Sequence, residues 1–268
     1  SKDTIKEDIV KARPTIIISV PRIFEKMHDA VWDAVRSGGK LKQWLFYRAL
    51  DFGSRRRQGK LRLWQRPVFD VLDFLVLKKI RSKLGGRLRF AVSGGSALSA
   101  HIIQFFWDIG LRVLEGYGLT ETSPVVSENT LTKHQFGSVG LLLNNFEAKI
   151  AEDGEILLRG SSVMRGYWRD PEATRQAIDP EGWLRTGDLG KLSEDGFLTV
   201  TGRKKELIVL STGRNVAPVP LEQALETNRF ISQAMVFGDN QKHISALIVP
   251  DFEELKLWAE KNNVEYNV

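Results

Sequence analysis

Residues 116–122 combine the side chains that a phosphate-bearing planar ligand would need. The run reads Gly-Tyr-Gly-Leu-Thr-Glu-Thr. Its glycines allow a ligand to approach the backbone closely, and the ring of Tyr117 can stack on a planar base. Thr120 offers a hydroxyl to a phosphate oxygen, and Glu121 offers the hard oxygen ligand that Mg²⁺ prefers. The alternative is an ordinary glycine-rich loop that exposes a threonine and a glutamate.

Two later runs carry further candidates. Residues 185–190 read Arg-Thr-Gly-Asp-Leu-Gly, and in a tight glycine loop the carboxylate of Asp188 can bind both hydroxyls of a ribose. An aspartate in an ordinary β-turn explains the same run. Residues 202–206 read Gly-Arg-Lys-Lys-Glu. Arg203 can pair there with phosphate or ribose oxygens, or the run is a solvated charge cluster at a domain linker.

One near match to a phosphate-binding P-loop is rejected. Residues 53–60 place five residues between the two glycines rather than four, and Leu61 follows the lysine where a serine or threonine is required. The sequence predicts instead a basic surface loop around residues 55–57.

The elements that position the first run form an α/β pattern. The β-branched stretch 14–20 predicts a buried strand, and Pro21 suits the first turn of the helix after it. Helical periodicity continues over 41–52 and 64–84. Two further strands, at 88–92 and 111–114, flank a helix predicted from Ser99 to Trp107.

Strands that alternate with helices predict a parallel sheet. Ligands bind outside the carboxyl ends of such strands. Gly94 and Gly116 each lie two residues after the end of a predicted strand, so we expect the two glycine loops to meet at one edge of the sheet.

The pattern changes after residue 136. Asp-Gly pairs at 153–154 and 195–196 separate apolar stretches and predict two hairpins. From residue 204, strands at 207–210, 233–238 and 245–250 accompany helices at 221–227 and from 251 onward. The expected fold is mixed α/β, in three parts: a partial parallel α/β subdomain (1–135), an antiparallel β-barrel-like subdomain (136–203) and a truncated small C-terminal α/β domain (204–268).

Composition excludes several classes of site. The 268 residues are 42% hydrophobic and 27% charged, as in a globular protein, and none is cysteine. Disulfides, cysteine-based zinc sites, iron–sulfur ligation and a thiol nucleophile are therefore excluded within the chain. The histidines show no metal-ligand spacing, no apolar run approaches the ~20 residues of a membrane span, and the start has no signal-peptide pattern. We expect a cytoplasmic protein.

The positive charge is concentrated in residues 40–89, which hold 15 basic and three acidic residues, a net +12 within a chain of net charge +6. Solvated helix faces explain such a stretch in many proteins. The functional alternative is attraction to an anionic membrane surface or a polyanionic substrate, which would make the protein peripheral at the membrane. Nucleic acid is not expected as a partner, since no nucleic-acid motif accompanies the charge.

Taken together, the motifs resemble the adenylate-forming (AMP-binding) superfamily of acyl-CoA synthetases, adenylation domains of peptide synthetases and luciferases. They occur in the order of that family. The matching stretches are 93–98 (adenine loop), 117–122 (Tyr-Gly-x-Thr-Glu signature), 160–174 (a further family stretch), 186–188 (ribose motif) and 202–215 (hinge and following loop).

Within the superfamily, residues 13–26, Glu115 and residues 122–126 look like the long-chain fatty acyl-CoA synthetase branch. The resemblance implies ATP- and Mg²⁺-dependent conversion of a fatty acid to an acyl-adenylate, and then thioester formation with coenzyme A. Two alternatives stay open: an acyl-adenylate or acyl-carrier-protein synthetase, and a non-catalytic nucleotide-binding module.

The resemblance also implies a role for each matching residue. Thr120, Glu121 and Arg203 would be catalytic, with Glu121 as the metal ligand. Lys205 would be the hinge, and Ser211, Thr212 and Gly213 would line the coenzyme A tunnel. The ATP- or AMP-binding residues would be Gly94, Gly95, Ser96, Glu115, Gly116, Tyr117, Gly118, Thr120, Asp188 and Arg203.

Two family elements are absent from the chain: the phosphate loop ending in Pro-Lys-Gly and the lysine near the family's C-terminus. The sequence therefore resembles an internal segment of a longer protein, and we expect the segment alone to be inactive. The expected small-molecule partners are a fatty acid, ATP and coenzyme A, and the sequence leaves the oligomeric state open.

Overall fold

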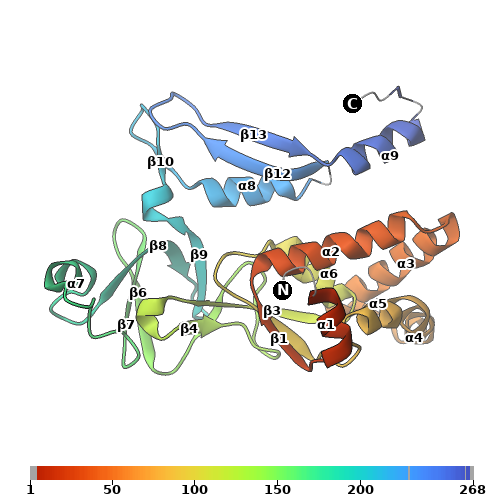
Figure 1. The fold of residues 1–268 in the computed structure, drawn as a ribbon, viewed down its shortest axis with the longest axis horizontal. Helices are drawn as coiled ribbons and strands as arrows, with labels where there is room; N and C mark the ends of the chain where they lie inside the picture. Colours follow the sequence, from red (N-terminus) through yellow and green to blue (C-terminus); the bar gives the residue numbers. More distant parts are fainter. Residues whose placement is uncertain (1–4, 229, 263, 266–268) are drawn as a thin grey trace. The chain divides into compact units, whose positions relative to one another are not determined.

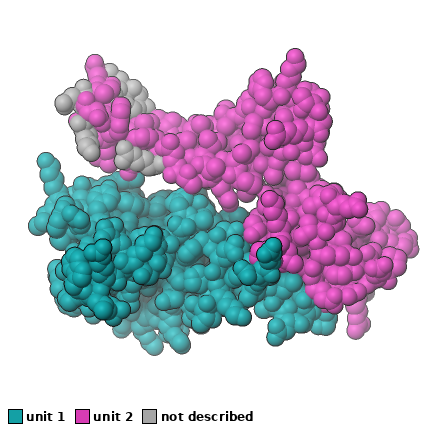
Figure 2. Space-filling model, turned by 180° about the vertical axis from the view of Figure 1, so that it is seen from behind, with its two compact units in different colours: residues 1–146, 161–164, 194–198 teal, residues 147–160, 165–193, 199–268 magenta. Residues whose placement is uncertain are grey.

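A computed structural model describes residues 5–228, 230–262 and 264–265. The chain divides into two compact units, coloured separately in Figure 2. The first unit contains the described residues up to Phe146, with Ser161–Met164 and Glu194–Leu198. The second contains Glu147–Gly160, Arg165–Ser193 and the described residues from Thr199 onward. The three-part division that the sequence suggests stays a prediction.

A parallel sheet forms the centre of the first unit (Figure 1). Its strands β1 (Ile16–Ser19), β2 (Phe90–Ser93) and β3 (Arg112–Gly118) are adjacent and parallel. The strands β4 (Val125–Glu128) and β5 (Gly140–Leu142) continue the sheet in antiparallel pairing. The expected mixed α/β class and the parallel arrangement of the first strands are therefore confirmed.

Helices flank this sheet. Pro21 occupies the first turn of α2, as the sequence predicts, and Gly110 follows α6 with a φ of +81°. A π-helical turn at Asp73–Leu77 joins α4 to α5, so the predicted helical stretch 64–84 is broken only by a local change of pitch. The helices of the first unit are α1 (Ile5–Ala12), α2 (Pro21–Arg36), α3 (Lys40–Arg57), α4 (Arg66–Leu72), α5 (Lys78–Lys83) and α6 (Ala100–Asp108).

The predicted basic loop at residues 55–57 is wrong, because α3 continues to Arg57. Gly53 does not end the helix. A side-chain carbon at this position would overlap the carbonyl oxygen of Asp108, so glycine lets α3 approach α6 closely. Arg57 then donates to the Asp108 carboxylate at 2.6 Å.

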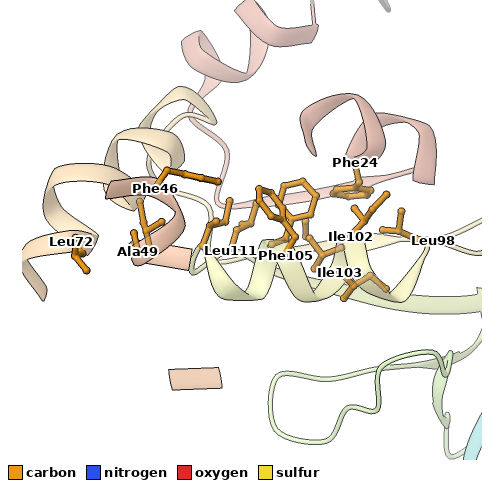
Figure 3. Packing of buried hydrophobic residues seen from close by; sticks show 14 of the residues in the cluster. Phe24, Phe46, Ala49, Leu72, Leu98, Ile102, Ile103, Phe105 and Leu111 are labelled. Carbon is orange, nitrogen blue, oxygen red and sulfur yellow. The ribbon is translucent and has the colours of Figure 1, made fainter. Parts of the chain in front are cut away.

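The core of the first unit lies between α2, α3, α4 and α6. Figure 3 shows Phe24 over the α6 residues Ile102 and Phe105, and Phe46 and Leu72 further along the same cluster. Phe24 and Phe46 are each only 1% exposed, and burial of such a side chain stabilises the fold by about 1.5–3 kcal/mol. This packing holds α6 against the sheet and thereby fixes the carboxyl ends of β2 and β3.

Antiparallel strands form the sheet of the second unit. The order is β9 (Phe197–Arg203), β8 (Leu184–Leu192), β7 (Glu155–Gly160) and β6 (Phe146–Ile150). The first two residues of β9, Phe197 and Leu198, belong to the first unit and pair with β5 there. Both predicted hairpins are confirmed, with φ of +85° at Gly154 and +82° at Gly196. The sequence analysis missed α7 (Pro171–Ala177), which Asp170 caps through the backbone N–H of Ala173.

The rest of the second unit contains two small sheets. The strands β10 (Ile208–Val209) and β11 (Asn215–Val216) pair with each other, as do β12 (Ile231–Phe237) and β13 (Ser245–Pro250). The helix α8 (Pro218–Glu226) packs on β12, and α9 (Phe252–Asn262) follows β13. Among the described residues, no helix combines the length and the apolar character that crossing a membrane requires.

Candidate active site

Two strand ends and one glycine loop lie together in the first unit. Ser93 on β2 is level with Glu115 on β3 in the parallel register. The next residue, Gly94, donates its N–H to the carbonyl of Ser19 at 3.1 Å, and a side-chain carbon on Gly94 would lie 3.6 Å from the carbonyl of Gly116. The predicted proximity of the two glycine segments is confirmed, although Gly116 lies within β3 and not in a loop after it.

Glu115 is a buried carboxyl group at this edge. It is 7% exposed, and one of its oxygens accepts the backbone N–H of Leu98 at 3.4 Å. Burial raises the pKa of Glu115 to about 7, and the Leu98 hydrogen bond offsets only part of that shift. The neighbouring Ser93 hydroxyl is also buried and has no hydrogen-bond partner among the described residues. Glu115 therefore ties the loop after β2 to the middle of β3.

A tight turn follows β3 and is organised around Thr122, whose side chain is fully buried. The Thr122 hydroxyl accepts the N–H of Leu119 at 3.0 Å and lies within 2.9 Å of the carbonyls of Leu119 and Pro124. A side-chain carbon on Gly118 would overlap the Pro124 carbonyl oxygen. Gly118 therefore permits a close approach to its own chain, and its predicted contact with the nucleotide stays a prediction.

This turn presents two of the predicted side chains. Thr120 is exposed and Glu121 is half-buried, both in the 3₁₀ turn Thr120–Thr122. The backbone carbonyl of Glu121 accepts the N–H of Met164 at 2.8 Å. Because both ends of the turn are tied down, the backbone that carries Thr120 and Glu121 is held in one conformation.

Tyr117 lies in strand β3 and not in a loop, which corrects the sequence-based boundary at residue 114. The strand continues because β4 pairs with it in antiparallel register, Gly116 with Glu128 and Tyr117 with Ser127. The sequence signal for this pairing is the apolar pair at 125–126. Tyr117 is half-buried at the end of the sheet.

The ribose motif forms a bulge in strand β8 of the second unit, where the sequence suggested a glycine loop or β-turn. Arg185 pairs with Leu157 and Leu189 with Glu155, so β8 has extra residues opposite β7 here. Gly187 takes a φ of +72° in the bulge, and its N–H donates to the Glu155 carboxylate at 2.9 Å. Strand pairing on both sides converts the expected turn into a bulge.

Asp188 and Arg203 are brought together in the second unit. Asp188 is 4% exposed, and the Nε of Arg203 lies 3.2 Å from its carboxylate. The Arg203 side chain is 62% exposed. The buried carboxylate can accept hydrogen bonds from hydroxyl groups, and the accessible guanidinium beside it can attract an anion.

Sequence reasoning missed a carboxylate–lysine cluster beside this pair. The Nζ of Lys204 lies 2.6 Å from Asp153 and 3.2 Å from Glu155. The hydrogen bonds to these carboxylates raise the pKa of Lys204, and the Lys204 bond lowers the pKa of Asp153. The same Glu155 also binds the N–H of Gly187, so one buried glutamate connects the ribose motif to the start of the predicted hinge. The sequence signal for this cluster is the Asp-Gly turn at 153–154, which places Asp153 and Glu155 side by side.

The remaining candidates are exposed parts of the second unit. Lys205 lies in the 3₁₀ turn Lys204–Glu206. Ser211, Thr212 and Gly213 form the loop between β10 and β11, with a φ of +79° at Gly213. The N–H of Ser211 donates to the carbonyl of Gln241 at 2.9 Å.

Two family models match the chain. The model of AMP-binding enzymes matches residues 1–168, and that of the AMP-binding enzyme C-terminal domain matches residues 205–265. Both fall in the order that the motifs suggest.

Curated relatives are similar over almost the whole chain. The long-chain-fatty-acid–CoA ligase FadD15 of Mycobacterium bovis is 43% identical over 253 residues, covering 94% of this chain and 42% of the ligase. The peroxisomal long chain acyl-CoA synthetase 7 of Arabidopsis thaliana is 35% identical over 278 residues, covering 98% of this chain and 39% of the synthetase. The chain therefore spans less than half the length of these relatives.

A solved structure shows the same architecture. The O-succinylbenzoate coenzyme A synthetase (MenE) of Bacillus subtilis, in complex with ATP and magnesium ion, is 29% identical with a TM-score of 0.55, covering 67% of this chain and 41% of MenE. Since the first family model spans more than half of the residues, the chain belongs to the AMP-binding enzyme family.

Proposed function

We propose that the natural protein carrying this sequence is a long-chain fatty acid–CoA ligase. It would activate a fatty acid with ATP and Mg²⁺ and then transfer the acyl group to coenzyme A. The main support is the fixed 3₁₀ turn that presents Thr120 and Glu121, in a chain whose curated relatives include long-chain-fatty-acid–CoA ligases. The buried Asp188 beside Arg203 adds a second polar site suited to a ribose.

In the first unit, the Thr120 hydroxyl would donate to a phosphate oxygen of ATP. Glu121 would hold Mg²⁺ through its carboxylate, and phosphate oxygens and water would complete the shell, as this ion prefers. Its half-buried position on an anchored turn fits that role. When bound, the ion draws charge from the phosphates. The ring of Tyr117 would stack on adenine, with Gly118 shaping the turn behind it and Gly94, Gly95, Ser96, Glu115 and Gly116 lining the base.

In the second unit, Asp188 would accept hydrogen bonds from the ribose hydroxyls. Arg203 already contacts this carboxylate and would also bind phosphate or ribose oxygens. Lys205 would be the hinge on which residues 204–268 turn between the two half-reactions. Ser211, Thr212 and Gly213 would line the coenzyme A tunnel.

Each half-reaction exchanges one bond for another. A fatty acid carboxylate oxygen attacks the α-phosphorus of ATP, and the bond to the β-phosphate oxygen breaks with release of pyrophosphate. The coenzyme A thiolate then attacks the acyl carbon, and the bond to the AMP oxygen breaks. Donors placed where charge develops, such as the Thr120 hydroxyl and the Arg203 guanidinium, would lower both barriers.

The test is exchange of labelled pyrophosphate into ATP by the natural protein, with fatty acids from short to long. We expect exchange to require a fatty acid and to be greatest with long chains. Glu121→Gln should lower the rate by about 100-fold or more at unchanged Tm. Glu194→Gln, an exposed glutamate, is the matched control and should retain full exchange.

Two outcomes would contradict the proposal. Exchange without a fatty acid would reject a fatty acid as the substrate. Full exchange by Glu121→Gln would reject Glu121 as the Mg²⁺ ligand. A second assay follows thioester formation and distinguishes coenzyme A from an acyl carrier protein as the acceptor.

A further inference from the structure

The helical stretch 63–83 has an exposed face that is apolar. Its buried face contributes Phe69, Leu72 and Leu77 to the core of the first unit. The opposite face carries large apolar side chains at helical spacing, all between 43% and 68% exposed. We call these residues the apolar ridge: Trp64, Val68, Val71, Phe74 and Leu75.

Basic residues border both ends of this ridge. Arg62 and Arg66 are exposed at its start, and Lys78 and Lys79 are exposed at its end. The Nζ of Lys78 lies 5.1 Å from the centre of the Phe74 ring, so positive charge and aromatic surface are in direct contact.

Acidic groups counter this charge only weakly. Asp70 is exposed on the same helix. Asp73 is engaged by Arg81 through two hydrogen bonds of 2.8 Å and 2.7 Å. Figure 1 shows α4, which carries Val68 and Val71 of the ridge, and α5, which follows the ridge, beside α3, and α3 begins at Lys40 and ends in Arg55–Arg57. The whole stretch 40–89 carries a net +12.

An anionic lipid surface matches both properties. Tryptophan, phenylalanine and aliphatic side chains settle at the boundary between headgroups and acyl chains. Flanking lysines and arginines are each attracted to an anionic leaflet. A second copy of the ridge would place like charges against each other, and a nucleic acid would leave the apolar side chains without a partner. We propose that the apolar ridge and its basic flanks bind an anionic membrane surface.

This binding would bring the protein to the phase in which long acyl chains partition, but it does not depend on the reaction. Vesicle binding tests the ridge, and pyrophosphate exchange tests the ligase. Failure of one proposal is therefore distinguishable from failure of the other.

The experiment is cosedimentation of the natural protein with vesicles of phosphatidylcholine, with and without phosphatidylglycerol. We expect binding to the anionic vesicles that weakens as salt is raised. Lys78→Glu together with Lys79→Glu should lower the partition coefficient by more than about tenfold. Lys191→Glu together with Lys242→Glu makes the same charge change at exposed lysines elsewhere and should leave it unchanged.

Insertion of the ridge is tested separately from charge. Trp64→Ala should lower partitioning about fivefold and remove part of the fluorescence quenching by brominated lipids. Trp168→Ala, which removes a tryptophan that is 86% exposed, is the control and should change neither. Because both tryptophans are exposed, both variants should fold. Thermal unfolding of each variant checks this.

Equal binding to neutral and anionic vesicles, or equal effects of the ridge and control variants, would overturn the proposal. A protein occupant of the ridge is tested with Val71→Cys and a water-soluble maleimide, since the chain has no cysteine of its own. Labelling that vesicles block supports the proposal. Labelling already blocked without vesicles would show that another segment or a second copy covers the ridge.

Discussion

Glu115→Gln should remove a pH-dependent loss of stability from the first unit. The pKa of Glu115 is 4.5 in a model peptide and is raised by burial to about 7 in the fold. The folded state therefore binds the proton more tightly than the unfolded state does. Unfolding free energy is greatest below pH 4.5, falls as the pH rises toward 7, and is level above it.

The size of the effect follows from that shift. Linkage between a pKa of 4.5 and one of about 7 costs about 1 kcal/mol at pH 5 and about 3 kcal/mol at pH 8. Glutamine cannot ionise, and its carbonyl oxygen can still accept the N–H of Leu98 that Glu115 binds. Relative to wild type, Glu115→Gln should therefore gain about 2 kcal/mol between pH 5 and pH 8.

The assay is urea unfolding of wild type and variant at several pH values, followed by tryptophan fluorescence. Burial lowers the pKa of His101 and of His134, which reduces stability as the pH falls. Both proteins share that contribution, so it cancels in their difference. Glu128→Gln, on the paired strand β4, is the control. A wild-type-to-variant difference that stays constant from pH 5 to pH 8 would refute the reasoning.

Three further predictions test the geometry of the two sites by substitution. Gly118→Ala should destabilise the first unit by about 3 kcal/mol, because the new methyl group overlaps a carbonyl, whereas Gly39→Ala meets open space; equal urea midpoints would contradict this. Thr122→Val should lower the free energy of unfolding by about 2–3 kcal/mol, because it leaves buried backbone groups unpaired. Thr120→Val should keep its stability and lose pyrophosphate exchange. The reverse pattern would exchange the roles of the two threonines. Lys204→Ala removes the ammonium group that pairs with Asp153 and Glu155. In single-turnover assays it should slow thioester formation more than adenylate formation. Equal slowing of the two steps would reject a contribution of Lys204 to the hinge.

The sequence by itself determined most of the elements and the family. Pro21 and the two Asp-Gly turns each specify a local conformation, because proline fixes φ and glycine tolerates positive φ. The β-branched stretch 14–20 forms a strand at Ile16–Ser19, but Ile16 and Ile18 are exposed there, so the predicted burial of this strand is wrong. Motif order was sufficient to identify the AMP-binding family, since several short matches in one order rarely arise together. The assigned chemical roles stay proposals.

Tertiary structure decided what the glycines do and which charges meet. Gly53 and Gly118 look like loop residues in the sequence, yet each makes room for another backbone segment. Their role depends on segments that a local pattern does not place.

The partners of Asp188, Glu155 and Lys204 were equally hidden. These residues are far apart along the chain, and only the pairing of β7 with β8 brings Glu155 to the bulge that holds Gly187. The shifted pKa of Glu115 has the same origin. Burial depends on how α6 and the sheet pack around the carboxyl group, and that packing is a property of the folded chain.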